Sequence, residues 1–451
     1  MDREAVMNAQ TTPAKSVKDI LSAYSIPAEL KSKVWSDVYF EKDGEKYYFV
    51  DLVMEGGGML GLGLVGYTYV LEQCNIRFRK IAGTSAGAIN AIGLSAAGTP
   101  DQPKTMAIAD VLDEVAFFSF VDGPKAVRDV VQNPGGGNMF SKGWRWMKGV
   151  ISGYKRLKAK RGLNPGQTFY DWMERKVLKP FGAAHLTGLA SKWTLPETVT
   201  LNHPPRFTYD KSAPFGGLAV KASCMAVGVE VTFPKDADLF YRPENDAPVA
   251  DFARASMSIP IFFDPFTLTD IPPYSDVKDR LQRDFSVTLK DPQKYGESVS
   301  FVDGGLLSNF PFDEFHAKPS KVPSMPTFGA KLGFDVDRFD NSSLLNFISN
   351  VVDIAKGNTD KEYRHEHFED YNRVVKEIDT TDIGWLDFDM SPEDKEKLIV
   401  NGCDAAVAFL KSFDWEEYRA FRQKNAAELI ASITGKPPEA EPESPEPAIP
   451  A

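Results

Sequence analysis

A serine flanked by two closely spaced glycines is the feature that most constrains this chain. Gly83 and Gly87 flank Ser85, which follows a run rich in strand-forming residues, Ile76 to Ala82, and precedes a run of small residues. This order predicts a strand, a sharp turn and a helix, in which glycine allows a tight turn and the serine hydroxyl stays accessible. We therefore predict Ser85 as a nucleophile, and the N–H of Ala86 at the helix start as a donor to a developing oxyanion.

A second glycine cluster lies about thirty residues upstream, after an apolar run, Tyr47 to Met54, that predicts a buried strand. It consists of Gly56, Gly57, Gly58 and Gly61. Bare N–H groups in such a loop can point at a developing negative charge. Together the two clusters predict a serine acyl hydrolase.

The glycine loop also fits a dinucleotide-binding pattern, because Gly56, Gly58 and Gly61 spell G-x-G-x-x-G between a strand and a helix. That pattern needs an acidic residue at the end of the next strand to bind a ribose. Here that strand ends before Ser85, and the nearest acid, Glu72, falls in the intervening helix. We therefore favour the hydrolase interpretation and expect no cofactor.

The nucleophile needs a base, and Asp303 is the candidate we favour. It follows a strand-like run, Ser298 to Val302, and Gly304 and Gly305 behind it let another backbone approach closely. Alternatively, Asp303 and Gly304 form an ordinary Asp-Gly turn without a catalytic role. A triad of Ser85, Asp303 and His316 would follow the order Ser, Asp, His that the catalytic residues of α/β-hydrolases have along the chain. However, the segment around His316 predicts the start of a helix, where we expect His316 to lie on a solvent-exposed face. No histidine or cysteine spacing predicts a metal site.

The element order predicts an α/β protein whose central, mainly parallel sheet is covered by helices. We expect a polar leader over 1–45 and a catalytic domain over 46–415, with a cap inserted at 100–245. A C-terminal helix over 416–436 and a disordered tail rich in proline and glutamate over 437–451 complete the chain.

The amino-acid composition indicates which partners this protein can bind and in which cellular compartment we expect it. The net charge of −11 argues against nucleic acid as a partner. Three cysteines without paired spacing indicate a reducing compartment, and neither a signal peptide nor a membrane-spanning stretch is visible. We expect a cytoplasmic protein that contacts membranes peripherally.

One segment stands apart from the acidic remainder. Between 142 and 161, lysines and arginines alternate with aromatic and aliphatic residues. Basic residues favour anionic surfaces and tryptophan favours the membrane interface, whereas an apolar stripe more often packs on the protein's own core. Both interpretations remain open. In the membrane interpretation, the residues that we predict to contact the membrane are Trp144, Trp146, Lys155, Arg156 and Lys158.

These motifs resemble those of the patatin-like phospholipases, a family marked by a glycine-rich oxyanion loop, a Gly-x-Ser-x-Gly elbow and a distant Asp-Gly-Gly. All three occur here in that order. Ala255 to Pro260 is similar to the family's Ala-Ser-x-x-x-Pro segment, and a closing helix, Leu398 to Leu410, also matches. The resemblance runs from about Tyr47 to Phe413. One departure is Leu60, where many relatives carry arginine or lysine.

The resemblance implies a metal-independent lipid acyl hydrolase with a Ser–Asp dyad. Ser85 would attack the ester carbonyl, and Asp303 would take its proton and later activate water. Gly57, Gly58 and Ala86 would hold the oxyanion. The expected substrate is membrane phospholipid or lysophospholipid, and a protein activator is a further partner that the sequence does not define. The alternative from another class is a catalytically idle module that keeps the fold and binds lipid or a partner.

Overall fold

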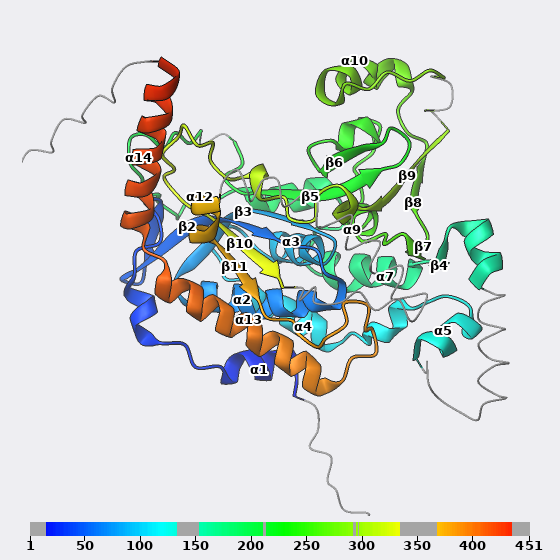
Figure 1. Cartoon of the computed structure of the whole chain (residues 1–451), viewed down its shortest axis with the longest axis horizontal. Helices are drawn as coiled ribbons and strands as arrows, with labels where there is room; N and C mark the ends of the chain where they lie inside the picture. Colours follow the sequence, from blue (N-terminus) through cyan, green and yellow to red (C-terminus); the bar gives the residue numbers. More distant parts are fainter. Residues whose placement is uncertain are drawn as a thin grey trace, which may run out of the picture.

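The chain forms a mixed β-sheet flanked by helices (Figure 1). The computed structural model describes residues 15–132, 153–210, 213–291, 295, 297–333 and 368–434. Trp144 and Trp146 of the predicted membrane segment, the first 14 residues and the predicted tail over 437–451 lie outside these ranges.

The main sheet has nine strands in the described part of the chain, in the order β11-β10-β2-β3-β5-β9-β8, with β1 beside β2 and β6 beside β5. From β11 to β5 the neighbours are parallel, and β9 and β8 continue the sheet antiparallel. The predicted α/β class with a mainly parallel centre is therefore confirmed. The strands are β1 Tyr39–Lys42, β2 Glu45–Met54, β3 Ile76–Thr84, β5 Gly217–Cys224, β6 Val229–Phe233, β8 Phe266–Thr269, β9 Ser298–Asp303, β10 Thr327–Leu332 and β11 Val375–Ile378. A separate parallel pair consists of β4 Gly162–Asn164 and β7 Ile261–Phe263.

The register of the parallel strands brings the sequence motifs together. Met54 at the end of β2 lies beside Gly83 of β3. Because the carboxyl ends of parallel strands share one edge, the glycine loop after Met54 and the turn at Ser85 must lie side by side. On the far side of β5, Ala222 pairs with Asp303 at the end of β9.

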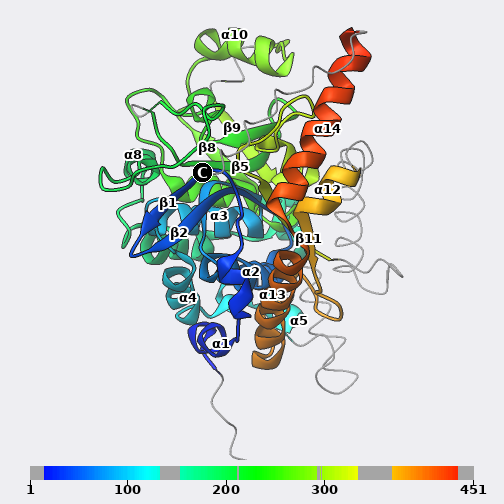
Figure 2. The same cartoon turned by 90° about the vertical axis from the view of Figure 1, so that its left-hand side faces the viewer.

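Helices cover the sheet on both sides. The helices below the sheet in Figures 1 and 2 are α1 Val17–Ala23, α2 Leu62–Gln73, α4 Thr105–Asp113 and α13 Pro392–Ser412. The others are α3 Ala86–Ala97, α5 Lys125–Gln132, α7 Gln167–Trp172, α8 Leu186–Ala190, α9 Val249–Ser256, α10 Tyr274–Phe285, α12 Phe368–Val374 and α14 Trp415–Thr434.

Glycine lets α2 and α13 pack closely. A Cβ on Gly402 of α13 would lie 1.9 Å from the carbonyl oxygen of Gly63, and one on Gly66 would lie 2.0 Å from that of Ile399. Real Cβ atoms essentially never approach so closely, so the crossing requires glycine on both helices.

Two predicted boundaries differ from the structure. From residue 15 onward the predicted leader belongs to the core: Leu21 and Trp35 are fully buried, and Trp35 Nε1 donates to Cys74 O at 2.8 Å. The predicted cap over 100–245 includes β5, which is a central strand, so its end at 245 is wrong. The inserted helices run from α4 to the short helix Ser191–Trp193 and end before Gly217. β5 was misassigned because its pairing partners lie far away in the sequence.

A buried carboxylate ties the inserted helices to α9. Asp251 of α9 accepts hydrogen bonds from Tyr170 of α7 and from Tyr241, each at 2.9 Å. Burial raises the pKa of Asp251 to about 6, against the opposing effect of the hydrogen bonds from Tyr241 and Tyr170.

This raised pKa predicts a pH-dependent stability. Because the native state binds this proton more tightly than the unfolded chain, Asp251 stabilises the protein below pH 4 and loses that effect as the pH rises through about 6. We expect the free energy of unfolding of wild type to fall, relative to Asp251→Asn, by ~2 kcal/mol between pH 4 and pH 7. Urea unfolding at a series of pH values measures this difference, and parallel profiles for the two proteins would contradict it.

Candidate active site

Ser85 occupies a strained turn between β3 and α3. Its φ of 51° and ψ of −116° are unusual for a residue with a side chain. A Cβ on Gly83 would lie 2.3 Å from the carbonyl carbon of Gly87, and one on Gly87 would lie 2.2 Å from Met54 O. The turn is therefore possible only with glycine at both flanks, which explains the motif.

The structure brings Ser85 and Asp303 together. Ser85 Oγ donates to Asp303 Oδ2 at 2.6 Å, and both residues are buried. The second carboxylate oxygen, Oδ1, accepts from Gly305 N at 2.7 Å, so the carboxylate is fixed in orientation. A Cβ on Gly304 would lie 2.3 Å from Lys221 O, so this glycine allows β9 to approach β5.

Two further serines hold this pair in place. Ser256, at the end of α9, accepts the backbone N–H of Ser85 on its Oγ at 2.9 Å. The N–H of Asp303 donates to Ser258 O at 2.8 Å. Both serines come from the Ala255 to Pro260 segment, so the end of α9 and the residues directly after it position Ser85 and Asp303 together.

The glycine loop begins the short helix Gly58–Gly61 beside Ser85. Gly58 has a φ of 54°, and a Cβ there would lie 2.2 Å from Trp385 O. The N–H of Gly56 donates to Asn309 O and that of Met59 to Trp385 O. In contrast, the N–H groups of Gly57 and Gly58 donate to no residue that the structure describes.

Asn309 joins the glycine loop to the segment that carries Asp303. Its Nδ2 donates to Gly56 O at 3.1 Å and to Glu55 Oε1 at 3.3 Å. The preceding residue, Ser308, accepts from Thr84 Oγ1 on its carbonyl at 2.9 Å. The sequence interpretation missed Asn309, although a polar residue just after Asp-Gly-Gly and before an apolar run was a usable signal.

Glu55 completes this connection. It is buried and accepts from Leu332 N at 2.7 Å and from Lys331 Nζ at 3.1 Å. Burial raises the pKa of Glu55, and the Lys331 ammonium opposes that rise. The start of the glycine loop is thus tied to both β10 and Asn309.

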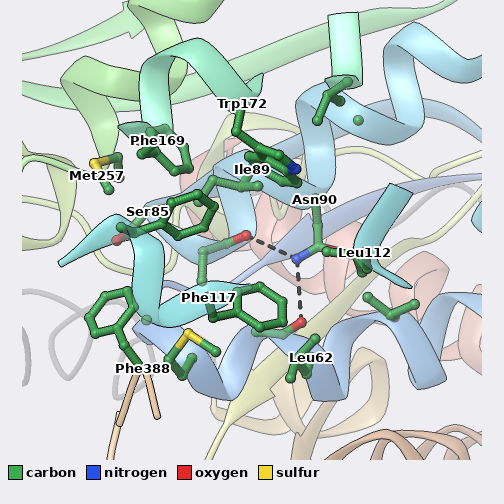
Figure 3. Close-up of a pocket in the computed structure, with 18 of the residues that line it drawn as sticks. Leu62, Ser85, Ile89, Asn90, Leu112, Phe117, Phe169, Trp172, Met257 and Phe388 are labelled. Carbon is green, nitrogen blue, oxygen red and sulfur yellow. Dashed lines mark hydrogen bonds between the residues drawn. The ribbon is translucent and has the colours of Figure 1, made fainter. Parts of the chain in front are cut away.

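An apolar cavity opens beside Ser85 (Figure 3). It encloses about 860 Å³ of empty space, counting the part open to solvent. One face of α3 lines it with Ala86, Ile89, Asn90 and Gly93. Asn90 Nδ2 donates to Ala86 O at 3.0 Å and to Gly61 O at 3.3 Å. Because these N–H donors already bind the protein's own backbone, Asn90 adds little polarity to the cavity wall.

Aromatic rings form the rest of this wall, and the sequence did not single them out. They come from segments far apart in the chain: Phe117, Phe120, Phe169, Trp172, Phe263 and Phe388. Phe388 stacks on Phe262 at 5.2 Å between ring centroids, which fixes the segment after β11 over the cavity.

The structure does not support the alternatives that the sequence left open. His316 Nε2 contacts Asp370 at 2.7 Å and Arg422 Nη1 at 3.1 Å instead of joining Ser85. Glu72 accepts from the N–H groups of Lys104 and Thr105 at the start of α4, so it does not face the glycine loop.

No cluster of three or more potential metal ligands occurs among the described residues. In the same part of the chain, no helix has the length and apolar character needed to cross a membrane.

A serine on a strained strand-to-helix turn, within hydrogen-bonding distance of a group that can accept its proton, has the arrangement of an activated nucleophile. The family model described as patatin-like phospholipase matches residues 52–316, more than half of the chain. The chain therefore belongs to the patatin-like phospholipase family, whose members hydrolyse lipid acyl esters.

Individual relatives are distant. The uncharacterized protein YqhO of Bacillus subtilis is 24% identical over 371 residues, which cover 81% of this chain and 100% of YqhO. The crystal structure of VipD from Legionella pneumophila gives a TM-score of 0.40 at 15% identity, over 87% of this chain and 74% of VipD. The ExoU–SpcU complex of the type III secretion system of Pseudomonas aeruginosa gives a TM-score of 0.32 at 14% identity, over 86% of this chain and 60% of that one.

The connection through Asn309 makes a testable prediction. Asn309→Ala removes the two hydrogen bonds that Nδ2 donates, to Gly56 O and to Glu55 Oε1, which should cost about 1–3 kcal/mol of stability. Because the loop then loses one of its anchors, while the contacts of Glu55 with β10 remain, we expect kcat on a lipid ester to fall roughly 10-fold or more while KM changes little.

Asn401→Ala serves as the control, because Asn401 also donates through Nδ2 to a backbone carbonyl, that of Asp379, at an exposed position. Steady-state kinetics and urea unfolding compare the two variants. Equal behaviour of the two would show that Asn309 does not position the loop.

Proposed function

We propose that this protein hydrolyses fatty acyl esters of membrane phospholipids or lysophospholipids, with Ser85 as nucleophile and Asp303 as base. The observation that carries the proposal is the 2.6 Å hydrogen bond from Ser85 Oγ to Asp303 Oδ2 beside an apolar cavity. An apolar cavity of this kind favours a hydrocarbon chain over a polar substrate.

The first half of the reaction forms an acyl-enzyme. Ser85 Oγ attacks the ester carbonyl carbon while Asp303 accepts the hydroxyl proton. The carbonyl oxygen becomes an oxyanion, which the N–H groups of Gly57, Gly58 and Ala86 stabilise. When the tetrahedral intermediate collapses, the carbon–oxygen bond to the alcohol breaks and the leaving alkoxide takes the proton from Asp303.

The second half releases the fatty acid. Asp303 takes a proton from a water molecule, whose oxygen attacks the acyl carbon of the ester on Ser85. Collapse of this second intermediate returns the proton to Ser85 Oγ and frees the carboxylic acid. One carboxylate thus acts in both halves, which agrees with its fixed orientation through Gly305 N.

Substitution of the two reacting residues tests this function. Ser85→Ala and Asp303→Asn should each lower the release of fatty acid from phosphatidylcholine or lysophosphatidylcholine vesicles by roughly 10³-fold or more. Both changes are nearly isosteric, so the melting temperature should move little.

The matched controls are Ser95→Ala, a buried serine on the same helix α3, and Asp251→Asn, a buried aspartate on α9. Mass spectrometry of the released acids measures all four variants. Activity that survives both Ser85→Ala and Asp303→Asn would remove the dyad, and a wild type without activity would favour the idle binding module instead.

Because Asp303 is proposed as the only base, we expect the reaction to proceed without a metal ion. Because the proposed steps use side chains and backbone N–H groups alone, turnover should be unchanged after dialysis against EDTA and on addition of Ca²⁺. Loss of turnover in chelator, restored by a divalent cation, would contradict this mechanism.

A further inference from the structure

An exposed basic surface lies next to the strand pair that contributes to the cavity wall. It consists of Tyr154, Lys155, Lys158, Arg161 and Ile261, and we call it the basic patch. Tyr154 is 67% exposed and Ile261 is 38% exposed, and they rank among the few large hydrophobic side chains on the described surface.

Arg156, which the sequence placed in this surface, holds the patch in place. Its Nη2 pairs with Asp264 Oδ2 at 2.6 Å and its Nε donates to Leu163 O at 2.9 Å. At 3.6 residues per turn, Arg156 faces away from Tyr154 and Lys158, so these two point outward. Arg156 therefore fixes the helical segment 153–160 on the β4–β7 pair, and we do not count it in the basic patch.

The patch is connected to the cavity through β7. Ile261 pairs with Gly162 of β4, and Phe263, two residues further on, lines the cavity together with Ile259. A surface that binds the basic patch would therefore lie next to the wall that the acyl chain is proposed to contact.

Ile261 has a backbone conformation that its side chain disfavours. Its φ is 72°, which is a true outlier for a β-branched residue and costs of the order of a few RT. Because 38% of the Ile261 surface remains exposed, its packing offsets this strain less than full burial would. The combination of strain and exposure points to a role outside the fold itself.

We propose that the basic patch docks the protein on an anionic lipid surface, with Tyr154 and Ile261 at the level of the headgroups. The chain carries a net charge of −11 and is repelled by such a surface as a whole, so attraction requires a local cluster of cations. Lys155, Lys158 and Arg161 form no ion pair with a described residue. Tyr154 directly precedes Lys155, and Ile261 pairs with Gly162, which follows Arg161. An aromatic ring with a polar tip and an aliphatic side chain near cations fit the membrane interface.

This docking rests on the proposed function, because it would deliver a lipid substrate to the cavity beside Ser85. The two proposals can nevertheless be tested apart. Docking is measured with the full chain carrying Ser85→Ala, so that no lipid is consumed. Hydrolysis is measured with Ser85 intact on a water-soluble short-chain ester, which needs no membrane.

The experiment is co-sedimentation with vesicles of phosphatidylcholine alone or with phosphatidylserine, at low and high salt. We expect binding only to the anionic vesicles, weakened by salt. The triple variant Lys155→Gln, Lys158→Gln, Arg161→Gln should bind roughly 100-fold more weakly, since each cation contributes about five-fold. The control variant Lys42→Gln, Lys278→Gln, Lys411→Gln removes the same charge from exposed positions elsewhere and should bind as wild type does.

Ile261→Asn separates docking from folding. Asparagine tolerates positive φ, so this variant should melt no lower than the parent protein, yet bind anionic vesicles more weakly. All docking variants should keep the parent rate on the soluble ester.

Two outcomes would overturn the proposal: no binding of the parent protein to anionic vesicles, or equal losses of vesicle binding in the two triple variants. Vesicle binding by the patch together with an inactive protein on every ester would instead leave docking intact and remove the proposed function.

Discussion

The hydrogen bond between Ser85 and Asp303 depends on the register of three neighbouring strands. The two residues lie 218 positions apart in the sequence, at the ends of β3 and β9 with β5 between them. A shift of β9 by one residue would turn the Asp303 side chain to the other face of the sheet. The pairing of Ala222 with Asp303, and the N–H bond from Asp303 to Ser258, therefore determine whether the site exists.

Backbone strain at this site is balanced by contacts from several elements. The positive φ at Ser85 costs of the order of 1–3 kcal/mol and persists only where the surroundings hold it. Ser256 binds its N–H, Thr84 is held through Ser308, and the helix α3 begins immediately after it. The glycine loop is held in the same way through Asn309 and Glu55. Ser85, Asp303 and the glycine loop thus form one connected unit.

The sequence could predict the residues whose backbone requires glycine, because a glycine that no other residue can replace leaves a clear pattern. Gly83, Gly87 and Gly304 each occupy a position where a Cβ would collide with backbone. These collisions are the reason that Ser85 and Asp303 could be singled out. The start of α13 was also predictable, since Ser391 Oγ caps it by accepting from Asp394 N.

Features that depend on distant partners could not be predicted in this way. The central position of β5 is set by strands on either side of it, so the sequence placed it in a cap. Phe117 and Phe388 look like ordinary apolar residues, and only the fold brings them to one cavity. Arg156 follows the spacing of an exposed basic face, but Asp264, 108 residues away, binds it.

The absence of a basic residue at Leu60 is compatible with this arrangement. Leu60 is buried, and the nearby cation Lys331 is paired with Glu55 at the start of the loop. The loop is therefore held by a buried ion pair beneath it, and negative charge on the substrate would be met by backbone N–H groups.

The most direct test of the central claim is to trap the nucleophile chemically. Treatment with a long-chain alkyl fluorophosphonate, followed by peptide mass spectrometry, identifies the residue that attacks. We expect one phosphonyl group per chain on Ser85, formed much more slowly when Asp303 is replaced by asparagine. A chain that stays unlabelled, or a label on any other residue, would contradict it.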